Sequence, residues 1–264
     1  MRRCSLVLLC VVFTTAACSS SSSSTKSGGG DPAVTTITVF AASSLTGGFT
    51  RIGKDFEAAH PGTTVSLNLG PSDGLAGQIE SEGTADVFAS ASATWMDDVR
   101  EKVGVSEETQ FATNQLVIIT PPDNPSNIGS IDDLAGDGVQ LVLAAPGVPV
   151  GDYAREALKS AGIASAAEAN VVSNEQDDAA LVAKIAGDEA DAAIVYLSDV
   201  TSTVAPTVKS IPIPKADNVI AVYPIAVVQG GDASGGARFI DYVAGPEGQA
   251  TLKTFGFLPP PATP

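Results

Sequence analysis

The chain has 264 residues, 44% of them apolar, and a formal net charge of −16 from 30 acidic and 14 basic side chains. This length and apolar content can supply the core of one large or two modest α/β domains. A surface this acidic repels nucleic acid and anionic lipid, which argues against a function in binding polyanions.

The first residues have the pattern of an export signal. Arg2 and Arg3 precede an apolar run at residues 6–13 and the sequence TAAC at residues 15–18, which is typical of a secretory signal peptide. The run is well under the roughly 20 residues that a membrane-spanning helix needs. We therefore expect residues 1–17 to be removed.

Cys18 directly follows two alanines, and this resembles the lipobox at which bacterial lipoproteins are cleaved and acylated, with Thr15 where Leu is usual. We expect lipidation of Cys18 and a flexible Ser/Gly linker over residues 18–34, which would tether the protein to the outer face of the cell membrane. Cys18 would be the only thiol of the mature protein, so a disulfide, a Cys metal site and a Cys nucleophile are not expected.

The first predicted structural unit is a strand, a turn and a helix over residues 37–56. Its strand ends at Ser43 and Ser44, and an apolar helical face then recurs at spacings of four, three and four residues, as Leu45, Phe49, Ile52 and Phe56. A hydroxyl at a helix start can hold an anion together with the free backbone N–H groups there, or it can serve only as an N-cap. If the turn is shifted by one residue, Ser43 takes the place of Ser44.

The same design is repeated along the chain. A strand at residues 65–69 delivers Ser72 to a turn that opens a second helix, and a third strand at residues 85–89 precedes a helix at residues 95–103. Repeated strand and helix units of this kind indicate a parallel sheet with helices packed on it.

The second part of the chain continues this alternation. Pro224 lies inside the last expected strand, so this strand is an edge or a crossing between domains. The expected strands cover residues 116–119, 139–144, 171–172, 192–196 and 219–228; the expected helices begin after the turn at residues 146–151 and cover residues 177–185, 238–243 and 248–255.

Six separated motifs then occur in order: VFAASSL at residues 39–45, ADVFAS with WMD at 85–90 and 95–97, YAREAL at 153–158, IVY at 194–196, YPIAVV at 223–228, and GPE with FGF at 245–247 and 255–257. This series resembles the substrate-binding protein of the bacterial molybdate ABC importer, over essentially the whole mature domain.

The resemblance implies an α/β fold of the two-lobe periplasmic-binding-protein type (type II, Venus-flytrap), each lobe a mostly parallel sheet flanked by helices. Lobe I would comprise residues 35–113 and 222–264, and lobe II residues 114–221. The implied function is capture of molybdate, and of tungstate, in the interlobe cleft and delivery to the membrane permease of an ABC importer. A monomer without enzymatic activity or cofactor is implied, with molybdenum present only as the bound oxyanion.

The family's ligand groups match particular positions of this chain. They are the side chain and backbone N–H of Ser44, Ser72, the backbone N–H groups of Val150 and Asp178, and the hydroxyl of Tyr196. Such a set makes chemical sense, because molybdate carries no proton at neutral pH and its oxygens only accept hydrogen bonds. A site made of donors would reject phosphate, whose proton needs an acceptor.

Two acidic residues depart from the family pattern, Asp73 beside Ser72 and Asp178 itself. An inward carboxylate would repel a dianion, and we expect both side chains to face solvent because an Asp at a helix start normally caps its own helix.

Other interpretations remain open for some of these residues. The ligand could be sulfate, thiosulfate or an organic anion, and Tyr196 could be a buried strand residue bonded to a backbone carbonyl. His60 is expected in a surface turn and Trp95 in packing. A hydrolase would need a Gly-x-Ser-x-Gly elbow with a partner His; Ser44 and Ser72 lack that frame, and His60 is the only His.

Overall fold

The computed structural model describes residues 35–261. The predicted signal peptide, the lipidation site at Cys18 and the linker at residues 18–34 lie outside the described residues. Within the described part, no helix has both the length and the apolar character needed to cross a membrane.

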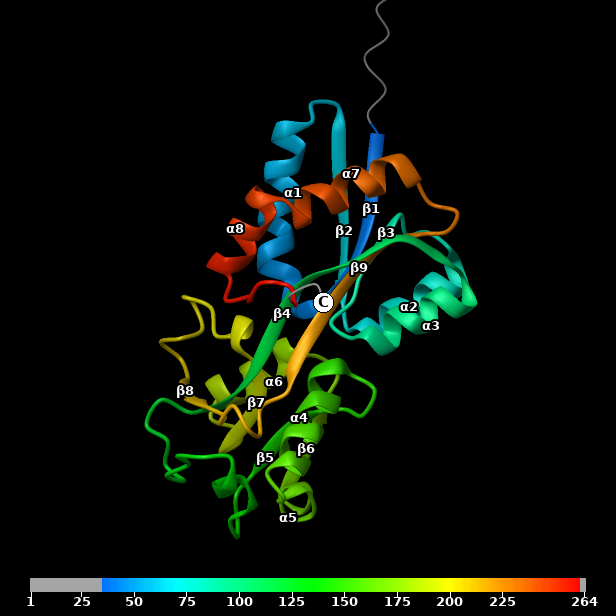
Figure 1. Cartoon of the computed structure of the whole chain (residues 1–264). Helices are drawn as coiled ribbons and strands as arrows, with labels where there is room; N and C mark the ends of the chain where they lie inside the picture. Colours follow the sequence, from blue (N-terminus) through cyan, green and yellow to red (C-terminus); the bar gives the residue numbers. More distant parts are fainter. Residues whose placement is uncertain (1–34, 262–264) are drawn as a thin grey trace, which may run out of the picture. The chain divides into compact units, whose positions relative to one another are not determined.

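One sheet runs through the described part in the order β2-β1-β3-β9-β4-β7-β5-β6, with β8 also paired to β4. We call the part around β1, β2 and β3 half I and the part around β5 to β8 half II (Figure 1). The elements of half I are β1 (Thr35–Ala42), η1 (Ser43–Leu45), α1 (Thr46–Ala59), β2 (Thr63–Gly70), α2 (Ser72–Glu82), β3 (Val87–Ala89), α3 (Ala93–Lys102), α7 (Ala233–Ala244) and α8 (Pro246–Thr254).

Half I is a parallel β2-β1-β3 arrangement covered on both faces. Alternate residues of each strand point to opposite sides of a sheet, and here both sides are apolar. On β1, Ile37 and Val39 belong to the core shared with α1 and α7, while Phe40 packs with Leu75 of α2 and Met96 of α3. The apolar stripe predicted for the first helix is confirmed, since its four side chains are fully buried.

Half II repeats the parallel design with β6-β5-β7. Its elements are η2 (Asp132–Ala135), β5 (Leu141–Ala144), α4 (Pro149–Ser160), α5 (Ala164–Ala169), β6 (Val171–Glu175), α6 (Asp178–Ala186), β7 (Ala192–Tyr196), η3 (Leu197–Asp199) and β8 (Lys209–Pro212). Its strands β5 and β7 are short, apolar and buried, as expected for parallel strands covered on both faces, whereas β6 at the edge of the sheet is partly exposed.

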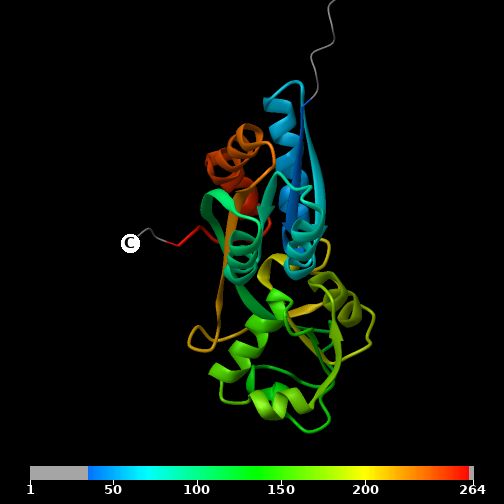
Figure 2. The ribbon, with the colours of Figure 1, turned by 90° about the vertical axis from the view of Figure 1, so that its right-hand side faces the viewer.

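Two antiparallel strands, β4 (Val105–Thr120) and β9 (Ile220–Val228), pass from one half to the other. Figure 2 shows them from a second direction. β9 lies between β3 and β4, so it is a crossing rather than an edge. Its proline is tolerated because Pro224 faces an irregularity in the β4 register at Gln110.

The structure differs from the sequence-based expectations at several elements. β4 is 16 residues long, whereas only residues 116–119 were expected, because its first half is polar and exposed. Strand β8 and helix α5 were not predicted, and α7 begins at Ala233 rather than at residue 238. The fold class, a mixed α/β sheet flanked by helices, agrees with the prediction.

Candidate functional site

Twelve residues at the carboxyl ends of the parallel strands line one pocket between the halves. Half I contributes the turns after β1, β2 and β3, and half II those after β5, β6 and β7. They are Ala42, Ser43, Ser44, Pro71, Ser72, Ala91, Val148, Pro149, Val150, Asp177, Asp178 and Tyr196. All five predicted ligand residues are therefore brought together at one place, where ligands of α/β sheets commonly bind.

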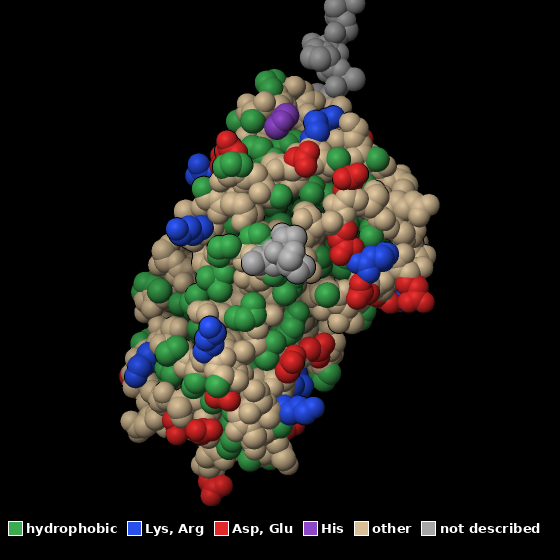
Figure 3. Space-filling model, in the orientation of Figure 1, with side chains coloured by type: hydrophobic (Ala, Val, Ile, Leu, Met, Phe, Trp, Pro, Cys, Tyr) green, Lys and Arg blue, Asp and Glu red, His purple; other side chains and the backbone are tan. Residues whose placement is uncertain are grey.

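The pocket is small, about 20 Å³, which is little more than the space that one buried water requires. A compact ion suits this space, and a larger hollow of about 310 Å³ shares Ser43, Ser44 and Asp178 with it. None of the lining residues is Lys, Arg or His. On the face shown in Figure 3, the Lys and Arg side chains of the described residues also lie apart from one another, without a continuous basic patch.

Ser44 is the half-buried residue that follows β1. Its Oγ lies 3.0 Å from the hydroxyl of Tyr223 on β9. The chain makes a 3₁₀ turn over Ser43–Leu45 before α1, and no side chain caps either helix start there. The N-cap function that the sequence left open for Ser44 is therefore not observed. Ser43 lines the pocket as well.

Ser72 is the first residue of α2 and is only 1% exposed. Its Oγ accepts a hydrogen bond from the backbone N–H of Ala91 at 3.0 Å. A serine hydroxyl has one hydrogen to donate in addition to its lone pairs. Because a backbone N–H already occupies the acceptor side of Ser72, its own hydrogen is available to an acceptor in the pocket.

Val150 and Asp178 lie in the first turns of α4 and α6 in half II. The first N–H groups of a helix have no acceptor within the helix. Gly151 and Asp152 bond to the carbonyl of Val148, which leaves the N–H of Val150 as a donor at the pocket. The backbone N–H of Asp178 interacts with the carboxylate of the same residue. A ligand oxygen would therefore have to compete with that carboxylate for this N–H.

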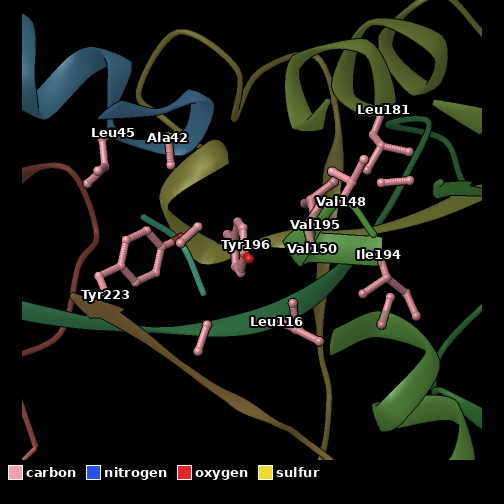
Figure 4. Packing of buried hydrophobic residues seen from close by; sticks show 14 of the residues in the cluster. Ala42, Leu45, Leu116, Val148, Val150, Leu181, Ile194, Val195, Tyr196 and Tyr223 are labelled. Carbon is pink, nitrogen blue, oxygen red and sulfur yellow. The ribbon is translucent and has the colours of Figure 1, made fainter. Parts of the chain in front are cut away.

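Tyr196 ends β7, and its hydroxyl is buried without any hydrogen-bond partner in the described chain. The bond to a backbone carbonyl that the sequence allowed is therefore not formed. Figure 4 shows Tyr196 between Tyr223 and Val150, and its ring lies 5.9 Å from that of Tyr223. Burial raises the pKa of Tyr196 well above its usual value, so the hydroxyl stays protonated and can donate.

The expectation that the Asp178 side chain faces solvent is wrong. Asp177 is the N-cap of α6, and its carboxylate accepts from the N–H of Ala180. Asp178 is one residue further on and is only 5% exposed. Burial raises its pKa to about 6. A carboxyl group with a strongly shifted pKa therefore lies in the wall of the pocket.

Asp199 is the partner of this carboxyl group. Its Oδ2 accepts the backbone N–H of Tyr196 at 2.9 Å, and burial followed by the charge of Asp178 raises the pKa of Asp199 well above its usual range. Asp178 and Asp199 therefore form a pair of interacting carboxyl groups, in which Asp199 holds a proton more readily than a free carboxyl group. No local pattern in the sequence indicates this pair, because Asp199 lies in a separate turn after β7.

Asp73, His60 and Trp95 do not line the pocket. Asp73 is half-buried and does not line the pocket, as expected, although its Oδ1 is buried without a partner among the described residues. His60 is half-buried and stacks on Phe56 at 4.1 Å; no metal-binding group of His, Cys, Asp or Glu occurs in the described part. Trp95 makes more than packing contacts: its indole N–H donates to the carbonyl of Gly147 at 2.8 Å.

Comparisons with known proteins agree with this arrangement. The family described as bacterial extracellular solute-binding protein matches residues 37–258. The chain is 39% identical over 228 residues, 85% of each chain, to the molybdate-binding protein ModA of Mycobacterium tuberculosis H37Rv. It is 32% identical over 229 residues, 84% of this chain and 88% of the relative, to that of Escherichia coli K12.

Solved structures show the same fold at lower identity. The periplasmic molybdate-binding protein of Azotobacter vinelandii superimposes with a TM-score of 0.74 at 19% identity, over 85% of this chain and 99% of its own. The sulfate-binding protein SubI of Mycobacterium tuberculosis superimposes with a TM-score of 0.73 at 17% identity, over 85% of this chain and 87% of its own.

Proposed function

The chain belongs to the bacterial extracellular solute-binding proteins, and we infer from the comparisons that it is a molybdate-binding protein that serves an ABC importer. Its activity is binding and transport rather than catalysis, as in the molybdate-binding relatives. The conclusion follows from the identity to these relatives over most of the chain. The groups that hold the ligand are a proposal of their own.

We propose that the oxyanion sits in the small pocket between the halves and is held by Ser44, Ser72, Val150, Asp178 and Tyr196. The observation that carries this proposal is the buried hydroxyl of Tyr196, which has no partner in the described chain. An unpaired buried polar group costs roughly 1–3 kcal/mol. A ligand oxygen in the pocket would remove that cost, and so would explain why the hydroxyl is there.

The donors in the pocket are neutral and suit a fully deprotonated anion. The hydroxyls of Ser72 and Tyr196 each have a hydrogen free for the ligand, and a hydrogen bond to a charged oxygen contributes about 1.5–3 kcal/mol. Two lining residues carry carboxylates: that of Asp177 accepts the backbone N–H of Ala180, and that of Asp178 is paired with Asp199. The hydroxyl and N–H donors of the pocket favour an unprotonated oxyanion over protonated phosphate.

We propose further that the halves are the two lobes of a closing cleft, with lobe I at residues 35–113 and 222–264 and lobe II at residues 114–221. The two crossing strands β4 and β9 support this division. Tungstate binding, a lipid anchor at Cys18 on the outer face of the membrane and a monomeric state belong to the same proposal. The lipobox-like sequence before Cys18 supports the anchor.

A thermal-shift series tests the ligand assignment. A ligand that binds only the folded state stabilises it by about 2.7 kcal/mol at a hundredfold excess over Kd. We expect a large upward shift of Tm with molybdate and tungstate and a small one with sulfate and phosphate. A shift with sulfate as large as that with molybdate would favour the alternative, a protein for sulfate or a similar oxyanion.

The same series with variants tests the site. Tyr196→Phe and Ser72→Ala should each reduce the molybdate-dependent shift, whereas Ser81→Ala should not, because Ser81 is an exposed residue of α2 that bonds only within its own helix. An unchanged molybdate shift in both pocket variants would place the ligand elsewhere.

A further inference from the structure

A row of buried polar side chains leads to Ser44 from the strands that join the halves. Asn114 lies on β4 and Tyr223 on β9, and both are fully buried. The Asn114 Nδ2 lies 3.5 Å from the Tyr223 hydroxyl, which in turn lies 3.0 Å from the Ser44 Oγ. The pairing of β4 with β9 brings them together, since Asn114 lies opposite Ala221 and Ala112 opposite Tyr223.

The direction of these hydrogen bonds is fixed at Asn114. Its Oδ1 accepts the backbone N–H of Gln115 at 3.0 Å, so the amide group cannot be turned around without placing two donors against each other. The NH₂ group therefore points toward the Ser198 Oγ, at 2.8 Å, and the Tyr223 hydroxyl. An amide nitrogen donates and does not accept.

The Tyr223 hydroxyl consequently accepts from Asn114, and its own hydrogen must go to another atom. Among the described residues, the Ser44 Oγ is the acceptor within hydrogen-bond distance. Buried hydroxyl groups rarely leave a hydrogen unpaired when an acceptor is in reach. Ser44 therefore accepts from Tyr223, and its own hydrogen is left to donate into the pocket.

We propose that Asn114 and Tyr223 are positioning residues that hold the Ser44 hydroxyl as a donor toward the bound oxyanion. This inference rests on the proposed function of the pocket. Neither residue touches the ligand; both act through Ser44. The Ser44 hydroxyl then matches that of Ser72, which accepts from the N–H of Ala91, and each of these serines has its own hydrogen free to donate into the pocket.

The surroundings of Tyr223 keep its hydroxyl in place. Its ring makes edge contacts with the rings of Tyr196, Phe111 and Phe257, at centroid distances of 5.9, 6.3 and 5.4 Å. Phenylalanine can keep these contacts because it lacks only the hydroxyl. Tyr223→Phe therefore removes the hydrogen bond to Ser44 with little change in packing.

A double-mutant cycle read by calorimetry tests the proposal. Tyr223→Phe should weaken molybdate binding about fivefold, because it leaves the Ser44 hydroxyl free to rotate. In the Ser44→Ala background the same substitution should leave Kd unchanged, since there is no hydroxyl left to orient. The matched control is Tyr242→Phe, a half-buried tyrosine that packs on Phe56, which should bind molybdate like the unmodified protein.

The cycle distinguishes orientation of Ser44 by Tyr223 from contact between Ser44 and the ligand. If Ser44→Ala weakens binding and Tyr223→Phe weakens it equally in both backgrounds, the orienting role is overturned while Ser44 remains a ligand residue. If Ser44→Ala leaves Kd unchanged, Ser44 does not touch the ligand, and the orienting role fails together with that part of the proposed site.

Asn114→Asp provides a second test at the other end of the row. A carboxylate at this position accepts the Tyr223 hydrogen, so Ser44 would have to donate to Tyr223 and turn away from the ligand. We expect a larger loss of affinity than for Tyr223→Phe. If this loss acts through Ser44, Asn114→Asp should weaken molybdate binding less in the Ser44→Ala background than in the unmodified protein. An equal loss of affinity in both backgrounds would contradict the proposal.

Discussion

The two walls of the pocket differ in how their polar groups are satisfied before a ligand arrives. In half I the acceptor side of Ser72 is occupied by the N–H of Ala91, and Ser44 bonds to Tyr223. In half II the hydroxyl of Tyr196 is unpaired and Asp178 is part of a carboxyl pair. The serine hydroxyls of half I are therefore already oriented to donate to an anion, whereas half II has an unpaired hydroxyl group and a titratable carboxyl group.

Because of this difference, variants of the two walls that both weaken molybdate binding should change the stability of the ligand-free protein in opposite directions. Tyr196→Phe should show the largest loss of molybdate affinity, about 10- to 100-fold, because it removes a hydrogen bond to a charged oxygen. The ligand-free protein should at the same time gain about 1 kcal/mol, since a buried unpaired hydroxyl is lost. Calorimetry and thermal melting without ligand measure the two effects.

Ser72→Ala should reduce molybdate affinity about tenfold, for the same reason. Here the ligand-free protein should lose about 1–2 kcal/mol, because the buried N–H of Ala91 is left without its acceptor. Ser81→Ala serves as the control, with both quantities unchanged. If Ser72→Ala and Tyr196→Phe change the stability of the ligand-free protein in the same direction, the contrast between the two walls is wrong.

The pH dependence of binding should come from half II. Burial places the pKa of Asp178 at about 6, while Tyr196, Tyr223, Asp177 and Asp199 are the other titratable groups close to it. A bound dianion raises this pKa further, so the complex takes up protons. Affinity for molybdate should therefore increase several-fold as the pH falls from 8.5 toward 6.

Asp178→Asn tests this assignment because it keeps the shape and removes the charge. Its affinity should vary little over that pH range and should exceed that of the unmodified protein at pH 8.5. In the unmodified protein without ligand, the raised pKa of Asp178 should lower the stability as the pH rises through about 6. The ligand-free Asp178→Asn variant should not show this decrease. A pH dependence that survives in Asp178→Asn would assign it to another group.

The smallest effect is expected at Trp95, which connects the two walls without lining the pocket. Its indole N–H donates to the carbonyl of Gly147 in the turn before α4. Trp95→Phe removes this single neutral hydrogen bond, worth about 0.5–1 kcal/mol, and should weaken binding about two- to threefold through faster release. Stopped-flow measurement of the dissociation rate checks it, and an unchanged rate would show that the contact has no part in ligand release.

The sequence predicted half I better than half II. Ser44 and Ser72 follow strands with clear apolar patterns, and the structure places both at the pocket. The prediction for Asp178 failed because the residue that caps α6 is Asp177, one position earlier. A shift of one position turns the side chain by about 100° and so moves it from solvent into the wall.

Other features depend on contacts between distant segments. Tyr223 is part of an apolar strand sequence, and only the pairing of β9 with β4 shows that its hydroxyl meets Ser44 and Asn114. The first half of β4 was missed since its polar residues resemble a loop, yet it is held in the sheet by β9. Such pairings have no local sequence signal.

The central claim is that neutral donors from both halves hold one molybdate ion. A crystal structure of the complex, measured at the molybdenum absorption edge, tests it most directly. We predict a single anomalous peak in the pocket, with oxygens in hydrogen-bond contact with Ser44, Ser72 and Tyr196 and with the N–H groups of Val150 and Asp178. A peak elsewhere, or an anion that leaves the Tyr196 hydroxyl unpaired, would contradict it.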